Sequence, residues 1–335
     1  MSQTTIETRF FNVVAASRIG DAMGTPTEDL TPAQIESQFG WVTEFEGDGT
    51  DDSLMASILA DALTKNRGYA NADQWATEIH RNRLAILQKR DKFFPSVLHL
   101  VEKLDYGYRP ADVAFGNMPS TSSAMCIWPV ALINAGQPDR AAGQAYELAR
   151  LIHIGEVDHC TDAAAALAAA IAAAFLPEAT IEKCVATGLE VLRPVSSETF
   201  RATLQASIDL AQRTPSYERF RTLYQEQHSR PIFCDSLETV PAAFGIALLA
   251  NGDVKTAVEY GANFGRDTDT IASMAGALTA ALAPGLPREW IVQLGDDNVA
   301  SAQAVAGQLH TTAVERAREQ VVIAEHARGL LEESK

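Results

Sequence analysis

Residues 51–66 read DDSLMASILADALTKN, and their apolar side chains recur every three or four positions. In an α-helix this spacing places them on one face, so the stretch predicts an amphipathic helix that packs against a core. The side chains of this face are Leu54, Met55, Ile58, Leu59, Ala62 and Leu63. Two acids open the predicted helix, where its dipole stabilises negative charge.

The same spacing extends over most of the chain. No segment alternates polar and apolar residues through several cycles between turn signals, so we expect no β-sheet. Gly, Pro and Asn interrupt the pattern only briefly, and no long Ser-, Gly- or Pro-rich linker occurs. We therefore predict one all-α domain over residues 1–335. The predicted helices cover 4–19, 51–66, 72–90, 121–134, 138–154, 160–176, 179–192, 198–212, 236–250, 253–263, 268–283 and about 310–333.

The net charge of the chain is −16, from 27 Lys and Arg against 43 Asp and Glu. Binding to nucleic acid or to an anionic membrane depends on an excess of Lys and Arg, so we expect neither as a partner. The acidic excess is compatible with divalent cations. A local basic cluster before Phe93 and Phe94 is either a solvated helix face, which the acidic background favours, or a nucleic-acid patch. Its members are Arg81, Arg83, Lys89, Arg90 and Lys92.

The longest apolar stretch, Ala163 to Leu176, is mostly alanine and predicts a buried helix. A membrane span needs about 20 strongly apolar residues. The opening residues, MSQTTIETRF, lack the basic region and apolar core of a secretory signal. The cysteines form no CxxC pair and are interpreted as buried thiols. We therefore expect a cytoplasmic protein, either a monomer or a small homo-oligomer. The cysteines are Cys126, Cys160, Cys184 and Cys234.

Two acidic motifs begin predicted helices, Gly49-Thr50-Asp51-Asp52-Ser53 and Gly265-Arg266-Asp267-Thr268-Asp269-Thr270. One helix cap needs only one such side chain, worth about 0.3–1 kcal/mol, so capping alone does not require either cluster. Carboxylates brought together repel one another unless a cation lies between them. Oxygen ligands without His or Cys suit Mg²⁺, Mn²⁺ or Ca²⁺. Two half-sites suggest two ions, about 3.5–4 Å apart, although spacing alone does not show that the motifs meet.

A third motif, GDAMGTPTE at residues 20–28, precedes both acidic motifs. Its glycines and proline predict a tight turn that ends a helix. Glu28 follows this turn. From the residues alone it is either an exposed loop glutamate or a functional acid.

The three motifs together resemble the ADP-ribosylglycohydrolase family, which includes the dinitrogenase reductase-activating glycohydrolases. The chain offers GDAMGTPTE, then GDGTDDSLM at 47–55, then GRDTDTIASMAGAL at 265–278. The resemblance covers about residues 10–290. It implies an all-α orthogonal bundle and a binuclear Mg²⁺ or Mn²⁺ centre. It also implies hydrolysis of the ribosyl N- or O-glycosidic bond of an ADP-ribosylated substrate, with arginine-linked ADP-ribose favoured.

The same resemblance assigns roles to individual residues. Glu28 falls where the family places an acid that contacts a metal or the catalytic water, and Glu28 and Asp267 are the implied catalytic residues. Asp21 is expected to pin the turn. The implied metal ligands are Thr50, Asp51, Asp52, Asp267, Asp269 and Thr270.

The chain departs from the family pattern where substrate contacts are expected. The family's Asn-Gly-Ser-x-Met-Arg run corresponds to residues 121–126, TSSAMC, in which Ser122, Ser123 and Met125 are the implied contacts. Asp158-His159 resembles the family's Thr-His before an alanine-rich helix, and His159 either touches ligand or is structural. Arg266 replaces a glycine, and either pairs with the neighbouring acids or reaches a phosphate or carboxylate of the substrate.

These departures leave two alternatives to an ADP-ribosyl substrate. The same chemistry on a smaller ribosyl or nucleoside-like glycoside would account for the altered run at 121–126. A non-catalytic ADP-ribose-binding or crystallin-like protein is the other alternative. The complete set of implied metal ligands argues against it.

Overall fold

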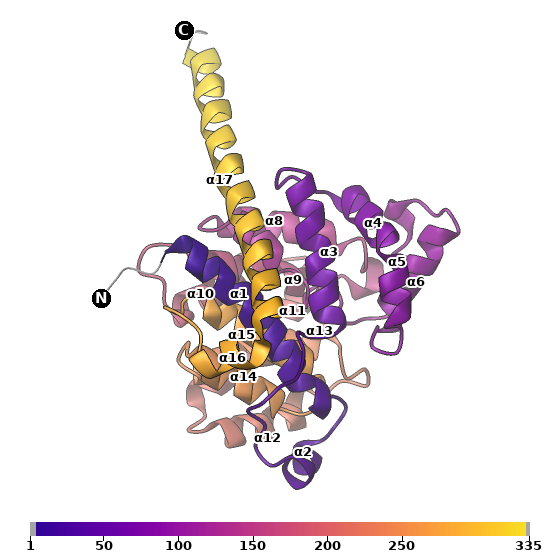
Figure 1. Cartoon of the computed structure of the whole chain (residues 1–335), viewed down its shortest axis with the longest axis vertical. Helices are drawn as coiled ribbons and strands as arrows, with labels where there is room; N and C mark the ends of the chain where they lie inside the picture. Colours follow the sequence, from indigo (N-terminus) through magenta and orange to yellow (C-terminus); the bar gives the residue numbers. More distant parts are fainter. Residues whose placement is uncertain (1–4, 333–335) are drawn as a thin grey trace.

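The computed structural model describes residues 5–332, and every regular element in that range is a helix (Figure 1). The all-α prediction is confirmed. No helix of this range is both long and apolar enough to cross a membrane. The α-helices are α1 (Ile6–Gly24), α2 (Pro32–Gln38), α3 (Asp51–Lys65), α4 (Ala72–Arg81), α5 (Arg83–Gln88), α6 (Pro95–Asp105), α7 (Trp128–Ile133), α8 (Pro138–Ala149), α9 (His159–Ala173), α10 (Ile181–Glu190), α11 (Glu198–Arg213), α12 (Tyr217–His228), α13 (Ser236–Leu249), α14 (Val254–Ala262), α15 (Thr268–Ala280), α16 (Arg288–Leu294) and α17 (Asp296–Glu332), and the 3-10 turns are η1 (Thr25–Thr27), η2 (Pro110–Asp112) and η3 (Gly155–Val157).

Helices α1 and α15 meet at backbone contact distance because glycines lie at their crossing. A Cβ atom on Gly20 would lie 2.5 Å from the backbone of Ala272, and a Cβ atom on Gly24 would lie 2.3 Å from the backbone of Asp269. No real Cβ atom fits at these distances, so glycine is required at both positions. The crossing places the C-terminal end of α1 directly beside the first turn of α15.

The hydrophobic core runs without interruption from Phe10 of α1 to Leu309 of α17. The alanine-rich helix α9 lies within it, with every residue from Cys160 to Ala173 buried, and packs against α8 and α10. The buried-helix interpretation of this stretch is therefore confirmed. All four cysteines are buried and free. The single-domain organisation stays a prediction.

Several predicted helix boundaries are wrong. The first part of the predicted helix 121–134 forms turns, and only α7 is helical. The reason is that Thr121 directs its hydroxyl to the carbonyl of Cys234, so local polar contacts compete with helix formation. The predicted helix 72–90 is two helices that join at Asn82. Helices α2, α6, α12 and α16 were not predicted. Helix α12 is largely polar, and few apolar residues mark its buried face.

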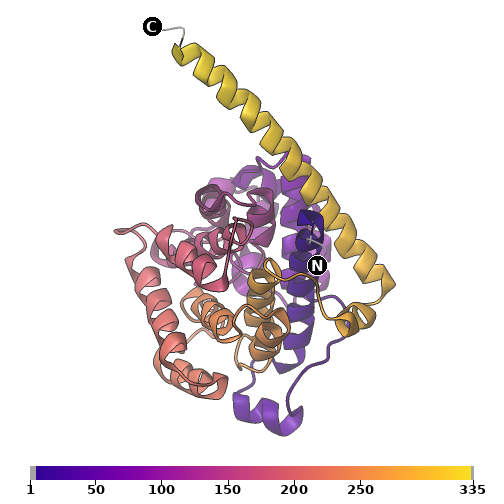
Figure 2. The ribbon, with the colours of Figure 1, turned by 90° about the vertical axis from the view of Figure 1, so that its left-hand side faces the viewer.

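The C-terminal helix α17 begins at Asp296 rather than near residue 310. It packs first against α1, α3 and α7 and then extends beyond the rest of the molecule, as the yellow ribbon shows in both views (Figures 1 and 2). Val321, Val322 and Ile323 on this extension are exposed. Residue 333 of the predicted helix and residue 4 of the predicted helix 4–19 lie outside the described residues.

Candidate metal centre

Asp21 from α1 caps the start of α3. Its carboxylate accepts hydrogen bonds from the backbone N–H groups of Thr50 and Ser53 at 2.8 and 3.0 Å, and from their hydroxyls at 2.7 and 2.6 Å. The predicted role of Asp21 was to pin its own turn. Its side chain instead accepts the hydrogen bonds of the groups at the N-terminal end of the next long helix, α3. Thr50 at the N-cap makes no capping bond. Because Asp21 already accepts these N–H groups, α3 does not need the carboxylates of Asp51 and Asp52 as caps.

The start of α15 faces the start of α3. The N-cap residue Asp267 makes no capping bond through its side chain. The hydroxyl of Thr270 lies 3.4 Å from Oδ1 of Asp52, which is 218 positions away in the chain. The two acidic motifs therefore meet. Thr121, which precedes the predicted contacts Ser122 and Ser123, reaches Oδ2 of Asp267 at 3.5 Å.

Glu28 completes the cluster from the end of η1. Carboxylate oxygens of Glu28, Asp267 and Asp269 all lie within 4.8 Å of one another. The tight turn that the glycines and proline predicted is present as η1, so Glu28 points back to the end of α1 and the start of α15. The structure thus brings Glu28 together with Asp267 and Asp269, and it places Thr270 against Asp52.

Burial and mutual repulsion raise the pKa of every aspartate in this cluster. The pKa of Asp51 rises to about 7, first because of burial and then because of the nearby charge of Asp21. Burial, followed by neighbouring carboxylates, also raises the pKa of Asp52, Asp267 and Asp269 well above its ordinary value. Within residues 5–332 none of these four aspartates forms an ion pair.

A hard divalent cation fits this arrangement. Oδ2 of Asp52 is buried and has no hydrogen-bond partner among the described residues, and an oxygen of this kind is costly to bury without a donor or a cation. The converging groups are carboxylates and threonine hydroxyls, which suit Mg²⁺, Mn²⁺ or Ca²⁺ better than zinc. Lys92 pairs with the edge of the cluster, since its Nζ lies 3.9 Å from Oε2 of Glu28. Lys92 belongs to the basic cluster for which the sequence favours a solvated helix face.

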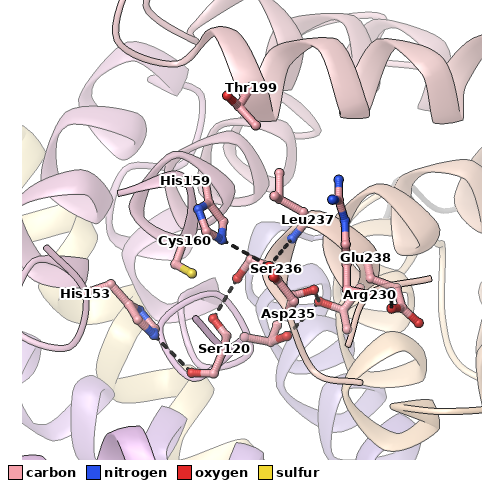
Figure 3. A network of polar contacts seen from close by, with 12 residues as sticks. Ser120, His153, His159, Cys160, Thr199, Arg230, Asp235, Ser236, Leu237 and Glu238 are labelled. Atoms are coloured by element: carbon pink, nitrogen blue, oxygen red, sulfur yellow. Dashed lines mark hydrogen bonds and ion pairs between the residues drawn. The ribbon is translucent and has the colours of Figure 1, made fainter. Parts of the chain in front are cut away.

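His159 and Asp235 form a second cluster, which also includes Cys160 (Figure 3). Nε2 of His159 lies 3.0 Å from Oδ1 of Asp235, the same oxygen that accepts the backbone N–H of Leu237 and caps α13. The three side chains offer nitrogen, sulfur and oxygen donors. Because His159 and Asp235 already form a hydrogen bond with each other, we assign no metal ion to this cluster. His159 is held in place by Asp235, and its contact with ligand stays a prediction.

The charge of His159 is expected to stabilise the fold in a defined pH window. Burial is the largest single effect and lowers its pKa, but the hydrogen bonds and charges of Asp235 and Cys160 together outweigh burial and raise the pKa to about 10. The stabilisation is therefore complete below about pH 6.5, the ordinary histidine pKa, and is lost as the pH rises through the folded value. His159→Gln should lower the free energy of unfolding by about 2 kcal/mol at pH 6, and by less than half of that at pH 9.

Denaturant unfolding at several pH values checks this expectation. His80→Gln is the matched control, because His80 also contacts an aspartate, Asp105, but both side chains are more than two-fifths exposed. A loss for His159→Gln that is the same at pH 6 and pH 9 would contradict the charged pair.

The run at 121–126 is buried, and its polar groups satisfy one another. Ser122 lies 2.9 Å from the hydroxyl of Ser96, and Ser123 lies 3.0 Å from Nδ1 of His153. Burial lowers the pKa of His153 to about 3, so its ring is neutral. Met125 is also buried. In this structure the three contacts predicted here, Ser122, Ser123 and Met125, lie in the protein interior. Thr121 is the member of the run that reaches the acid cluster.

Arg266 pairs with Glu238 rather than with the acids beside it in sequence. Its Nε donates to one oxygen of Glu238, its Nη2 donates to the other at 3.0 Å, and Nη2 also donates to the carbonyl of Arg230. The partner of Arg266 in this structure is therefore a buried glutamate on α13, and contact with the substrate stays a prediction. Figure 3 shows Arg230 and Glu238 beside the His159–Asp235 pair.

The backbone of Arg266 explains why a glycine is usual at this position in the resembled motif. Its φ is +66°, in the left-handed region that favours glycine. Its N–H donates to the carbonyl of Leu30, and its carbonyl accepts the N–H of Asp29, both at 2.8 Å. This pair of bonds fastens the loop that carries Glu28 to the loop that carries Asp267. The side-chain pair with Glu238 offsets the strain.

Arg266→Ala is expected to lower the free energy of unfolding by about 3 kcal/mol, because it leaves the buried carboxylate of Glu238 without its cation. Arg109→Ala is the control, since Arg109 pairs with Asp112 while its side chain is 82% exposed; its expected loss is below about 1 kcal/mol. Denaturant unfolding of both variants measures the difference. Equal losses would show that the Arg266–Glu238 pair contributes no more than a surface contact.

Comparisons with known proteins agree with the motifs. A family model described as ADP-ribosylglycohydrolase matches residues 2–319. A protein of Escherichia coli (strain K12), described as "Uncharacterized protein YegU", is 26% identical over 297 residues, covering 82% of this chain and 87% of the relative. An "Uncharacterized protein" of Archaeoglobus fulgidus is 26% identical over 300 residues, covering 87% and 93%. A solved structure titled "ADP-ribosylglycohydrolase-related protein complex" shares the fold with a TM-score of 0.69 at 18% identity, covering 92% of this chain and 99% of that one.

Proposed function

Because the chain belongs to the ADP-ribosylglycohydrolase family, we propose that it is a metal-dependent hydrolase of a ribosyl glycosidic bond, with an arginine-linked ADP-ribosyl side chain as the favoured substrate. One observation carries the proposal. Four buried aspartates from the starts of α3 and α15 converge without forming an ion pair among the described residues. We also propose a cytoplasmic location and a monomeric or small homo-oligomeric state.

Two divalent cations, Mg²⁺ or Mn²⁺, would be held by the carboxylates and hydroxyls of the two acidic motifs. When bound, they would fix ribose hydroxyls and lower the pKa of bound water. The proposed ligands are Thr50, Asp51, Asp52, Asp267, Asp269 and Thr270.

The chain's own residues supply the remaining chemistry. Cleavage of a ribosyl bond develops positive charge at the anomeric carbon, which the surrounding carboxylates stabilise electrostatically. Glu28 is suited to take the proton of the attacking water, because its side chain is 28% exposed, whereas the aspartates are buried. Its pKa is raised by burial, although Lys92 opposes the rise. A raised pKa brings a carboxylate closer to the range of an effective general base.

The test is release of ADP-ribose from arginine- and serine-linked substrates, with Mg²⁺ or Mn²⁺ and with a chelator. We expect turnover that the chelator abolishes and that returning the metal restores. Turnover that persists in the chelator would exclude the metal-dependent mechanism. Tight ADP-ribose binding with no turnover of any ribosyl substrate would favour the non-catalytic alternative.

A smaller ribosyl or nucleoside-like glycoside is the second candidate substrate. The observation in its favour is that Ser122, Ser123 and Arg266 already satisfy internal partners, so they do not stand ready to bind a diphosphate. A panel of ribonucleosides, assayed beside the ADP-ribosyl substrates, separates the two. Turnover of nucleosides alone would replace the favoured substrate while leaving the metal mechanism in place.

A further inference from the structure

The last part of helix α17 projects from the body of the molecule. Burial along the helix ends at Thr312, and no residue from Ala313 to Glu332 is buried. Figures 1 and 2 show this segment, the C-terminal arm, at the end of the yellow helix. A helix of this length is marginal in water by itself, because most helical stability in proteins comes from the packing of an amphipathic face. The arm is therefore expected to have a packing partner.

One side of the C-terminal arm faces the body of the protein. The guanidinium of Arg316 lies over the ring of Tyr69, 4.6 Å from its centroid. Glu319 accepts a hydrogen bond from Arg67 at 2.5 Å. Arg316 and Glu319 lie on the same row of the helix as the buried Thr312, since they follow it by four and seven positions. The opposite side of the arm is open to a partner.

The opposite side of the arm carries a coiled-coil pattern. Small or apolar residues, with Arg328 as the one exception, recur there at alternating spacings of three and four positions, which is the spacing of a seam between two helices. At about 3.6 residues per turn the seam lies roughly 140° around the helix from the row of Thr312. Val321 and Leu331 are 57% and 74% exposed, so each would bury apolar area in a helix pair. The seam consists of Val314, Ala317, Val321, Ala324, Arg328 and Leu331.

We propose that the C-terminal arm pairs with the same arm of a second copy of this chain, and that the two helices run antiparallel. In the register that uses the whole arm, Ala313 lies opposite the partner's Glu332, so pairing ends where burial against the body begins. The dimer does not depend on the proposed function, because the arm contains none of the proposed site residues. In this register the seam residues face one another in pairs, which are Val314 with the partner's Leu331, Ala317 with the partner's Arg328, and Val321 with the partner's Ala324.

The charges beside the seam favour the antiparallel orientation. In the same register Arg318 faces the partner's Glu325. The partner's Arg328 faces the small side chain of Ala317, which leaves room for its guanidinium to reach Glu315. All four charged side chains are exposed, and none of them forms an ion pair within the described part of the chain. A parallel pair would instead place the two copies of Arg328 against each other in the seam, where like charges are costly.

Analytical ultracentrifugation of the full chain between about 1 and 200 µM measures the association. The seam is short and contains two alanines and an arginine, so we expect a dissociation constant in the micromolar range. Val321→Glu should weaken the dimer at least about tenfold, because it places a carboxylate in the seam. Ile323→Glu is the matched control, since Ile323 is 58% exposed on the same arm but lies off the seam. The control should change the dissociation constant less than about threefold.

Two outcomes of this measurement would overturn the proposal. One is a chain that remains monomeric at about 200 µM. The other is equal weakening by Val321→Glu and Ile323→Glu, because the loss would then come from the added charge and not from the seam.

Exchange of the flanking charges tests the orientation of the two arms. Arg318→Glu should weaken the dimer about tenfold, because it places two acids opposite each other on both sides of the twofold axis. Adding Glu325→Arg to the same chain should restore the wild-type dissociation constant within about threefold, because opposite charges then face each other again. A dimer that Arg318→Glu leaves unchanged, or that the second change does not restore, would overturn the antiparallel register.

Discussion

In Asp267→Asn, hydrolysis of a ribosyl substrate is expected to fall by about a thousandfold or more, the loss that follows when a metal-binding carboxylate is neutralised. Asp267 is the N-cap residue of α15, yet its side chain makes no capping bond, so the substitution removes little from the helix. It lies within 4.8 Å of Glu28 and Asp269 through carboxylate oxygens. Neutralising it therefore removes negative charge from the point where the carboxylates from three segments meet.

The same variant should be at least as stable as wild type when no metal is present. In wild type, burial and the charge of Glu28 raise the pKa of Asp267. The charged form of Asp267 is therefore unfavourable in the metal-free fold. Thermal unfolding with and without Mg²⁺ separates this effect from misfolding. Wild type should gain stability on adding Mg²⁺, and Asp267→Asn should gain little. Asp61→Asn, on the exposed side of α3, should behave like wild type. Activity of Asp267→Asn within tenfold of wild type would contradict the assigned centre.

Glu28→Gln is expected to lower kcat by about 10²- to 10⁴-fold, the range observed when a general base is removed. The effect on Mg²⁺ affinity should be smaller than in Asp267→Asn, because the four aspartates remain. The reason is the position of Glu28, which is partly exposed and borders the cluster rather than lying in its interior. Isothermal titration with Mg²⁺ beside single-turnover kinetics measures the two effects separately.

Asp29→Asn is the matched control for Glu28→Gln. Asp29 is adjacent, exposed and has a positive φ of +64°, a conformation that Asn tolerates. It should retain activity within about threefold of wild type, since it removes a nearby charge without removing the proposed base. Equal losses in the two variants would mean that Glu28 acts only through the general electrostatics of the loop.

The fold class and the two acidic motifs could be recognised from sequence, because both leave strong local signals, whereas the meeting of the motifs could not be read from their spacing. Apolar residues at helical spacing mark α3, and Thr-Asp-Asp and Asp-Thr-Asp-Thr exceed what helix capping needs. The same reasoning placed the start of this helix at residue 121, whereas α7 begins at Trp128. The polar side chains at 121–123 instead find partners far away in the chain. A local pattern does not contain that information.

Three residues near the centre could not have been placed from sequence. Asp21 caps a helix other than its own, and Glu238 serves Arg266 from a different part of the chain. Lys92 reaches Glu28 although its neighbours look like an ordinary basic helix face. Each relation joins segments that only the packed structure brings together. The signal available for Asp235 was its place before an apolar helix, which is typical of an N-cap.

The glycine crossing of α1 with α15 has a consequence for synthesis of the protein. The first helix finds its most extensive partner only after residues 268–280 have been made, long after residues 6–24. At about 5–20 residues per second this interval is of the order of tens of seconds. During that time half of the acid cluster and the glycine face of α1 lack the segment that covers them. A nascent chain that stops before Thr268 would thus present a chaperone with an open helix face and would have no catalytic capacity.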